Sequence, residues 1–119
     1  MPDAETLVNW EQARAAIGGD EQLLKSVIEA FLEEAPTLLA SIRQGLGERD
    51  AIQWHRAAHT LKGTLSYFGN PPAAESAQRL EGMGRRSSFA EAPLILAELE
   101  AQLARVLACL SAHLGQPAV

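Results

Sequence analysis

Apolar residues recur every three or four positions through most of this chain, which is the spacing of one face of an α-helix. The longest such segment begins after Asp20, a good helix N-cap residue. Its apolar positions are Leu24, Val27, Ile28, Phe31, Leu32, Leu38, Leu39, Ile42 and Leu46. Pro36 falls inside it and removes one helical hydrogen bond, so we expect one kinked helix that ends near Gly45 to Gly47.

A second helical segment begins after Asp50 and ends at Gly69. Its apolar positions advance by four, three, four and three residues, and they are Trp54, Ala58, Leu61, Leu65 and Phe68. A polar row follows the same rhythm one residue later, about 100° further around the helix. That row is His55, His59, Lys62 and Ser66. We therefore expect the apolar row in the core and the polar row toward solvent.

Two shorter helices are predicted from their end signals. Asn9 with Gln12 resembles a capping box, and Gly18-Gly19 marks the end of the helix that it opens. Asn70 as N-cap, with Pro71 at the first helical position, predicts another helix after Gly69. We expect the helix after Gly69 to be closed by Gly82 and Gly84. Its expected core residues are Leu80 and Met83.

The last helix is predicted from a capping box at Ser88 and Glu91. Its apolar positions keep a three-four alternation, and they are Leu96, Leu99, Leu103, Val106 and Leu110. We expect it to run to about His113, followed by a frayed tail over residues 116–119.

Together these elements predict an all-α fold. Four longer helices with short connections form an antiparallel, up-down four-helix bundle, and the additional short N-terminal helix covers one end. The length of 119 residues and the hydrophobic content of 47% suit a single domain over residues 1–119, with an ordered core of about residues 7–114. Aromatic residues make up only 5% of the chain, which favours close-packed helices over a sheet.

The net charge of the chain and its distribution indicate which class of partner the protein binds. The formal net charge of −5 disfavours nucleic acid, whose binders normally present a basic face. Residues 54–86 nevertheless hold five basic and two acidic side chains, or +3, which leaves −8 for the remainder. A locally basic surface on an acidic protein suits a phosphate group or an acidic partner surface.

The sequence contains no apolar run long enough to cross a bilayer, and its first residues lack the pattern of a signal peptide. We therefore expect a cytoplasmic domain that makes no membrane contact of its own. Cys109 is the only cysteine and lies in an apolar stretch, so we expect it to serve packing.

His59, Lys62 and Gly63 share one helical face and suggest a site that carries phosphate. An imidazole with the usual histidine pKa of about 6.5 is partly neutral at physiological pH and then has a lone pair for attack on phosphorus. A lysine on the same face supplies positive charge to phosphoryl oxygens. Gly63 costs about 1 kcal/mol relative to alanine in mid-helix, so we expect it to clear space beside the imidazole. Close helix packing is the alternative reason for this glycine.

The segment Ala58-His59-Thr60-Leu61-Lys62-Gly63, continuing to Phe68-Gly69, resembles the signature of histidine-containing phosphotransfer (HPt) domains of two-component phosphorelays. Three further features are similar to that family: Phe31-Leu32-Glu33-Glu34-Ala35-Pro36, the Gly-Gly-Asp turn before it, and Leu80-Glu81 followed by Gly84-Arg85. The resemblance therefore covers nearly the whole chain.

This resemblance implies a four-helix bundle whose exposed histidine accepts a phosphoryl group from a receiver-domain aspartate and passes it to another receiver. His59 would be phosphorylated at Nε2, Lys62 would stabilise the phosphoryl charge, and Gly63 would give access. In some members a polar residue on the following helix holds the other imidazole nitrogen. Glu81 stands at the corresponding position here, where its carboxylate would orient His59.

The implied partners are receiver domains of response regulators and of a hybrid sensor kinase, docking on a monomeric domain. The residues expected to contact them are His55, Arg56, Ser66, Tyr67 and Arg85, with Leu65 and Phe68 wherever these are exposed. The sequence has no P-loop, no carboxylate cluster for Mg²⁺ and no nucleotide-binding glycine pattern, which indicates no ATP site and no kinase activity of its own. We expect no cofactor on this chain and Mg²⁺ on the receiver.

The segment from Leu7 to Asp20 looks like those of C-terminal modules in hybrid kinases, so we expect such a module, tethered to a membrane sensor, rather than a free-standing protein. Two other functions stay open. His55 and His59 have the four-residue spacing that zinc sites use, although a third ligand is not evident. The second is a helical docking module that binds receiver or kinase domains without phosphotransfer.

Overall fold

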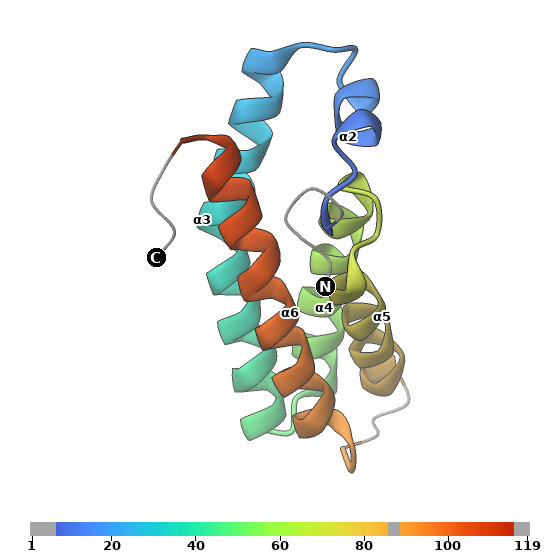
Figure 1. Cartoon of the computed structure of the whole chain (residues 1–119). Coiled ribbons are helices and arrows are strands. Elements are labelled where there is room, and N and C mark those ends of the chain that lie inside the picture. Colours follow the sequence, from blue (N-terminus) through green and yellow to red (C-terminus); the bar gives the residue numbers. More distant parts are fainter. Residues whose placement is uncertain (1–6, 86–88, 116–119) are drawn as a thin grey trace.

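A computed structural model describes residues 7–85 and 89–115 of the chain. Within these ranges the structure contains helices and no strand, which confirms the predicted all-α fold. The helices are α2 (Trp10–Ala16), α3 (Glu21–Gly47), α4 (Ala51–Tyr67), α5 (Pro72–Arg85) and α6 (Ala92–His113). Figure 1 shows α3 and α6 running along the length of the molecule, α4 and α5 beside them, and α2 near one end.

The predicted apolar rows form the core. All five residues of the α4 row are fully buried, and so are Leu24, Ile28 and Ile42 of α3 and Leu99, Leu103, Val106 and Leu110 of α6. The bundle is closed around these rows because each helix buries the face on which they recur. The predicted core residues Leu80 and Met83 of α5 are buried as well.

Helix α3 continues through Pro36 as a single element and ends at Gly47, as predicted. Gly45 lies inside it and has a packing role. A Cβ atom at Gly45 would come within 2.9 Å of the Trp54 main-chain nitrogen, and the Gly45 carbonyl accepts a hydrogen bond of 2.7 Å from Asp50. This glycine therefore lets the start of α4 lie directly against the end of α3.

Three predicted N-caps are present. The side chains of Asn9, Asp20 and Asp50 accept hydrogen bonds of 3.0–3.2 Å from main-chain N–H groups in the first turns of α2, α3 and α4. The reciprocal half of the capping box predicted for Gln12 is not formed. Its amide instead donates to the carbonyl of Ser66 at 3.1 Å, and therefore ties α2 to the end of α4.

The start of α5 differs by one residue from the prediction. Asn70 has a left-handed φ of 54°, so it does not act as an N-cap, and the helix begins at Pro72 rather than at Pro71. Asn70 instead completes a Schellman motif at the end of α4, donating to the Leu65 carbonyl at 3.3 Å while Gly69, with a φ of 92°, donates to Ser66.

Helix α5 also continues through the two glycines that were expected to end it, and reaches Arg85. Gly84 serves packing, because a Cβ atom there would come within 2.6 Å of the Trp54 indole nitrogen and 2.9 Å of the His55 Cβ. The prediction that Gly82 and Gly84 end this helix is therefore wrong.

The capping box predicted for the last helix is also wrong. Glu91 precedes α6 as its N-cap residue, makes no side-chain capping bond, and is followed by Pro93 in the first turn. Ser88 and the predicted frayed tail at residues 116–119 lie outside the described residues, as do residues 1–6.

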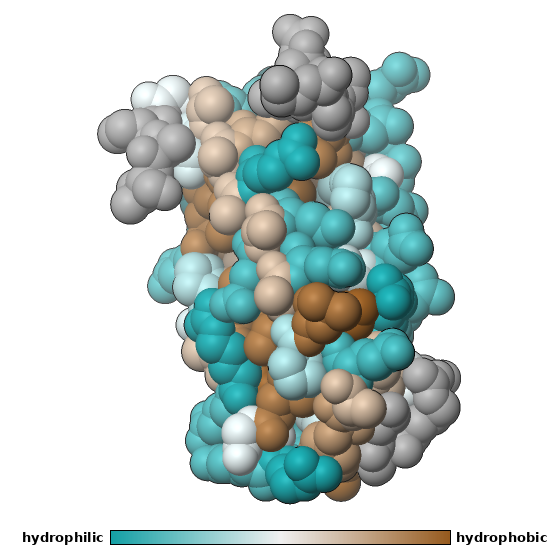
Figure 2. Space-filling view, turned by 60° about the horizontal axis from the view of Figure 1, so that its bottom comes forward, coloured by the Kyte–Doolittle hydropathy of each residue, from teal (hydrophilic) through white to brown (hydrophobic). Residues whose placement is uncertain are grey.

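On the face shown in Figure 2, hydrophilic residues surround a smaller group of hydrophobic ones. The large apolar side chains that remain exposed in the described ranges lie on three different helices, and they are Leu23, Ile52 and Leu94. None of the described helices combines the length and the apolar character that a membrane span requires.

Candidate functional site

The His59 imidazole lies on the solvent side of α4, with 66% of its side chain exposed. This position follows from the helical rhythm, because the residues before it and after it in the apolar row, Ala58 and Leu61, are fully buried. His59 is therefore accessible to a partner, as predicted from its position in the polar row.

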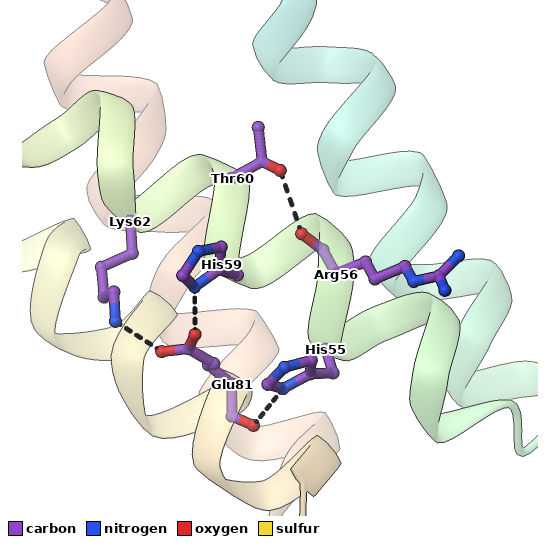
Figure 3. A network of polar contacts seen from close by, with 6 residues as sticks. All are labelled: His55, Arg56, His59, Thr60, Lys62 and Glu81. Carbon is purple, nitrogen blue, oxygen red and sulfur yellow. Dashed lines mark hydrogen bonds and ion pairs between the residues drawn. The ribbon is translucent and has the colours of Figure 1, made fainter.

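The carboxylate of Glu81 on α5 joins two residues of this face (Figure 3). Its Oε2 atom pairs with Nδ1 of His59, and its Oε1 atom accepts a hydrogen bond of 2.6 Å from Nζ of Lys62. Only 4% of the Glu81 side chain is exposed, whereas 31% of the Lys62 side chain is. A polar group buried in this way requires partners, and both carboxylate oxygens have one.

The Glu81 carboxyl group stays ionised in this setting. Burial alone would raise its pKa, but the hydrogen bonds from Lys62 and His59, together with their charges, outweigh burial and leave the pKa below its ordinary value. A carboxylate can only accept, so Nδ1 of His59 carries the proton. The lone pair of a neutral His59 imidazole is therefore at Nε2, and Glu81 fixes that tautomer.

His55 lies one turn before His59 and is half-buried, not solvated as the sequence suggested. Its Nδ1 atom is 3.0 Å from the main-chain oxygen of Glu81. A carbonyl can only accept, so Nδ1 of His55 also carries a proton. The two imidazole rings are stacked, with centroids 6.4 Å apart and planes 20° from parallel.

Two neighbouring side chains of α4 form hydrogen bonds with two neighbouring main-chain carbonyls of α5. Besides the contact of His55 with Glu81, the buried indole N–H of Trp54 donates to the Leu80 carbonyl at 2.8 Å. The absence of a side chain at Gly84 permits this approach. These contacts fix the register of the two helices and hence the place of the Glu81 carboxylate beneath His59.

Gly63 lies beside this site with open space around it. A Cβ atom at Gly63 would have no neighbour within 4 Å, so the alternative explanation, close helix packing, is wrong. A shallow hollow of about 420 Å³ lies here, lined by residues that include Lys62, Gly63, Ser66 and Asn70. A second and larger hollow, of about 840 Å³, shares Lys62 with the first and is also lined by Arg79 and Glu81 of α5.

The residues predicted to contact a partner differ in their accessibility. Arg56 is exposed, and Ser66 and Tyr67 are half-buried. Leu65 and Phe68 are fully buried, as their place in the apolar row predicts, so they do not meet the condition of exposure under which a docking role was expected. Arg85 is the last residue of α5, and its side chain lies outside the described part of the chain.

The described residues contain no group of three or more histidine, cysteine, aspartate and glutamate side chains placed to hold a metal ion. The paired histidines considered for zinc use one ring nitrogen each to bind Glu81, through its main chain in one case and its carboxylate in the other.

Comparisons with known proteins agree with this geometry. The family model described as the Hpt domain matches residues 26–109, which is most of the chain. A sequence comparison with curated proteins gives no match.

Two solved structures share the fold. Histidine-containing phosphotransfer protein B (HptB) from Pseudomonas aeruginosa PAO1 has a TM-score of 0.83 and 21% identity, covering 92% of this chain and 95% of its own. The HPT domain of an Hpt sensor hybrid histidine kinase from Shewanella has a TM-score of 0.80 and 21% identity, covering 98% of this chain and 100% of its own.

Proposed function

The chain belongs to the Hpt domain family, whose members transfer phosphoryl groups in phosphorelays, and from this premise we propose that His59 is the residue that carries the phosphoryl group. One observation supports this assignment above the others. His59 combines an exposed ring with a buried carboxylate on Nδ1, which leaves Nε2 as the nucleophilic atom facing solvent.

In the proposed reaction a receiver domain brings an aspartyl phosphate and Mg²⁺ to His59. The Nε2 lone pair forms a bond to phosphorus while the bond from phosphorus to the aspartate oxygen breaks, and the aspartate leaves as a carboxylate. The ring then holds the phosphoryl group on Nε2 and its proton on Nδ1, so it carries a positive charge. The Glu81 carboxylate stabilises that charge through its contact with Nδ1. Transfer to the next receiver reverses these bond changes.

Lys62 contributes its charge through Glu81. A buried carboxylate beside His59 would repel an approaching phosphoryl group, and the ammonium 2.6 Å away compensates it. Gly63 gives access, since the open space beside it lets the receiver approach the histidine. The exposed and half-buried side chains around His59 would line the docking surface, and Arg56, Ser66 and Tyr67 are the described ones.

We further place this domain in the cytoplasm as a monomer that serves receiver domains, either free-standing or as a module tethered within a hybrid sensor kinase. The TM-score of 0.80 to the Shewanella kinase domain is compatible with the second arrangement. The chain would need no cofactor of its own, because the receiver supplies the metal.

The test is intact-mass analysis after incubation with phosphorylated receiver domains and Mg²⁺. We expect one alkali-stable, acid-labile phosphoryl group on the wild type and on the control variant His113→Gln, and none on His59→Gln. His113 is a suitable control because it lies at the end of α6, stacked on Trp10 with ring centroids 4.0 Å apart. Binding of receivers without any phosphate on the wild type would instead make this a docking module.

A further inference from the structure

The charge balance around His59 changes when it is phosphorylated. Before the reaction the described ionised groups next to its ring are the Glu81 carboxylate and the Lys62 ammonium, which compensate one another. A phosphoryl group on a protein side chain adds nearly two negative charges at neutral pH. The Lys62 charge already balances the Glu81 carboxylate, so the added negative charge would favour a further positive group beside His59.

His55 is the side chain positioned to become that group. Its ring is stacked against that of His59 with a centroid separation of 6.4 Å, which is less than the Debye length of about 8 Å at physiological ionic strength. The main-chain oxygen of Glu81 holds its Nδ1–H and so anchors the ring. Among the described residues Nε2 of His55 has no hydrogen-bond partner, so that atom remains available to take up a proton.

We propose that His55 is a second phosphoryl-handling residue, which takes up a proton at Nε2 when His59 is phosphorylated and stabilises the phosphoryl oxygens as a cation. This inference rests on the proposed function of His59. It gives His55 a role in the stability of the phosphorylated state, whereas the sequence suggested only a contact with the partner.

The step balances without any further reactant. The phosphoryl group moves from the aspartate oxygen to Nε2 of His59 as described above, and the proton that His55 gains comes from solvent. When the group leaves for the next receiver, His55 returns the proton to solvent. No proton passes between the two histidines, because Nδ1–H of each ring stays bound to Glu81.

Among the groups around His55, the phosphoryl group on His59 makes the largest change in charge during the reaction. The charged or titratable groups described around it are His59, Lys62 and its sequence neighbour Arg56 on α4, and Glu81 on α5. Glu81 and Lys62 are paired with each other, and Arg56 keeps its charge at every relevant pH. A phosphorylated His59 holds its Nδ1 proton against Glu81.

The first measurement is a ring-nitrogen NMR titration of His55 in the wild-type domain, before and after phosphorylation by phosphoramidate, a small-molecule phosphoryl donor. Two negative charges at about this separation in a largely aqueous setting correspond to roughly one pH unit. We therefore expect the His55 titration midpoint to move upward by about one unit. A midpoint that stays in place while His59 carries phosphate would overturn this inference alone.

The second measurement uses His55→Asn, whose amide nitrogen occupies the position of Nδ1 and can still donate to the Glu81 carbonyl, but never becomes charged. For the wild type we expect the equilibrium constant for transfer from a receiver to fall about tenfold between pH 6 and pH 8.5, beyond any fall that the variant shows. The sign follows because a cation stabilising the phosphorylated state is lost as pH rises through its titration.

The variant also separates charge from anchoring. Titration of the phosphoryl group itself is common to both proteins and cancels in the comparison. Equal pH profiles for wild type and His55→Asn would contradict the role of charge. Anchoring is measured by comparing His55→Ala with His55→Asn, because both lack the charge and only His55→Ala also loses the bond to Glu81. Absence of phosphate on His59 in every condition would overturn the proposed function and this inference together.

Discussion

The ammonium nitrogen of Lys62 lies 2.6 Å from the Glu81 carboxylate, whose side chain is only 4% exposed. The sequence placed Lys62 on the same face as His59 and predicted a direct contact with phosphoryl oxygens. In the unphosphorylated domain Lys62 is paired with the carboxylate that orients His59. The positive charge of Lys62 therefore already balances the Glu81 carboxylate in the unphosphorylated domain. Glu81, on α5, contacts both Lys62 and His59 of α4.

Replacing Glu81 by glutamine should slow phosphorylation of His59 by roughly 10- to 100-fold, by analogy with the carboxylates that orient metal-bound histidines. The amide cannot stabilise the positive ring that forms after attack, and it leaves Lys62 without its counter-charge. Single-turnover transfer from a phosphorylated receiver measures this rate. Glu29→Gln, at an exposed position on α3, should transfer at the wild-type rate. Equal rates for both variants would contradict the role of Glu81.

Acid should remove the stability that the Glu81 contacts provide. The pKa of this carboxyl is lower in the folded protein than its ordinary 4.5, because the contacts with Lys62 and His59 outweigh the effect of burial. A lowered folded-state pKa means that this contribution is fully present above pH 4.5 and is lost as pH falls through the folded-state value. Urea unfolding from pH 7 to pH 3 should therefore show the stability advantage of wild type over Glu81→Gln shrinking below pH 4.5. A difference that stays constant would refute this linkage.

Gly84→Ala should destabilise the domain by about 1–3 kcal/mol, as overpacking of a filled site does. The added Cβ would come within 2.6 Å of the Trp54 indole nitrogen, which is itself held by its hydrogen bond to Leu80. Denaturant unfolding measures the loss. A variant as stable as the wild type would show that the contact between α4 and α5 adjusts freely.

Gly63→Ala should not destabilise the domain, but it should slow phosphotransfer. The new methyl group meets no atom of the domain, so helix propensity should leave stability unchanged or raise it by up to about 1 kcal/mol. Transfer from a receiver should nevertheless become slower, because the methyl group enters the space beside His59. Gly47→Ala, at the end of α3 and equally open, is the matched control and should transfer normally. Normal transfer by Gly63→Ala would rule out the access role.

The sequence predicted the features that depend on local rules. The apolar rows of α4 and α6, the N-caps at Asp20 and Asp50, and the exposure of His59 all follow from helical spacing and side-chain chemistry. The place of Glu81 beside His59 was predicted only from the resemblance to HPt domains. Its burial and its bond to Lys62 were beyond such reasoning, because they depend on how closely two helices approach.

The errors have the same physical origin. A glycine that ends a helix and a glycine that admits a neighbouring side chain look alike in a sequence, and Gly84 is of the second kind because Trp54 packs against it. Asn70 was read as the start of α5, but its backbone completes the end of α4.

The described contacts that shape the nucleophile join residues 19 to 26 positions apart, all within the helical hairpin of α4 and α5. Contacts of such short sequence separation require the closure of only a small loop and are formed rapidly during folding. The arrangement of His55, His59, Lys62 and Glu81 is therefore encoded by one contiguous stretch of about 30 residues. Helices α3 and α6 supply the apolar surface against which that stretch is packed.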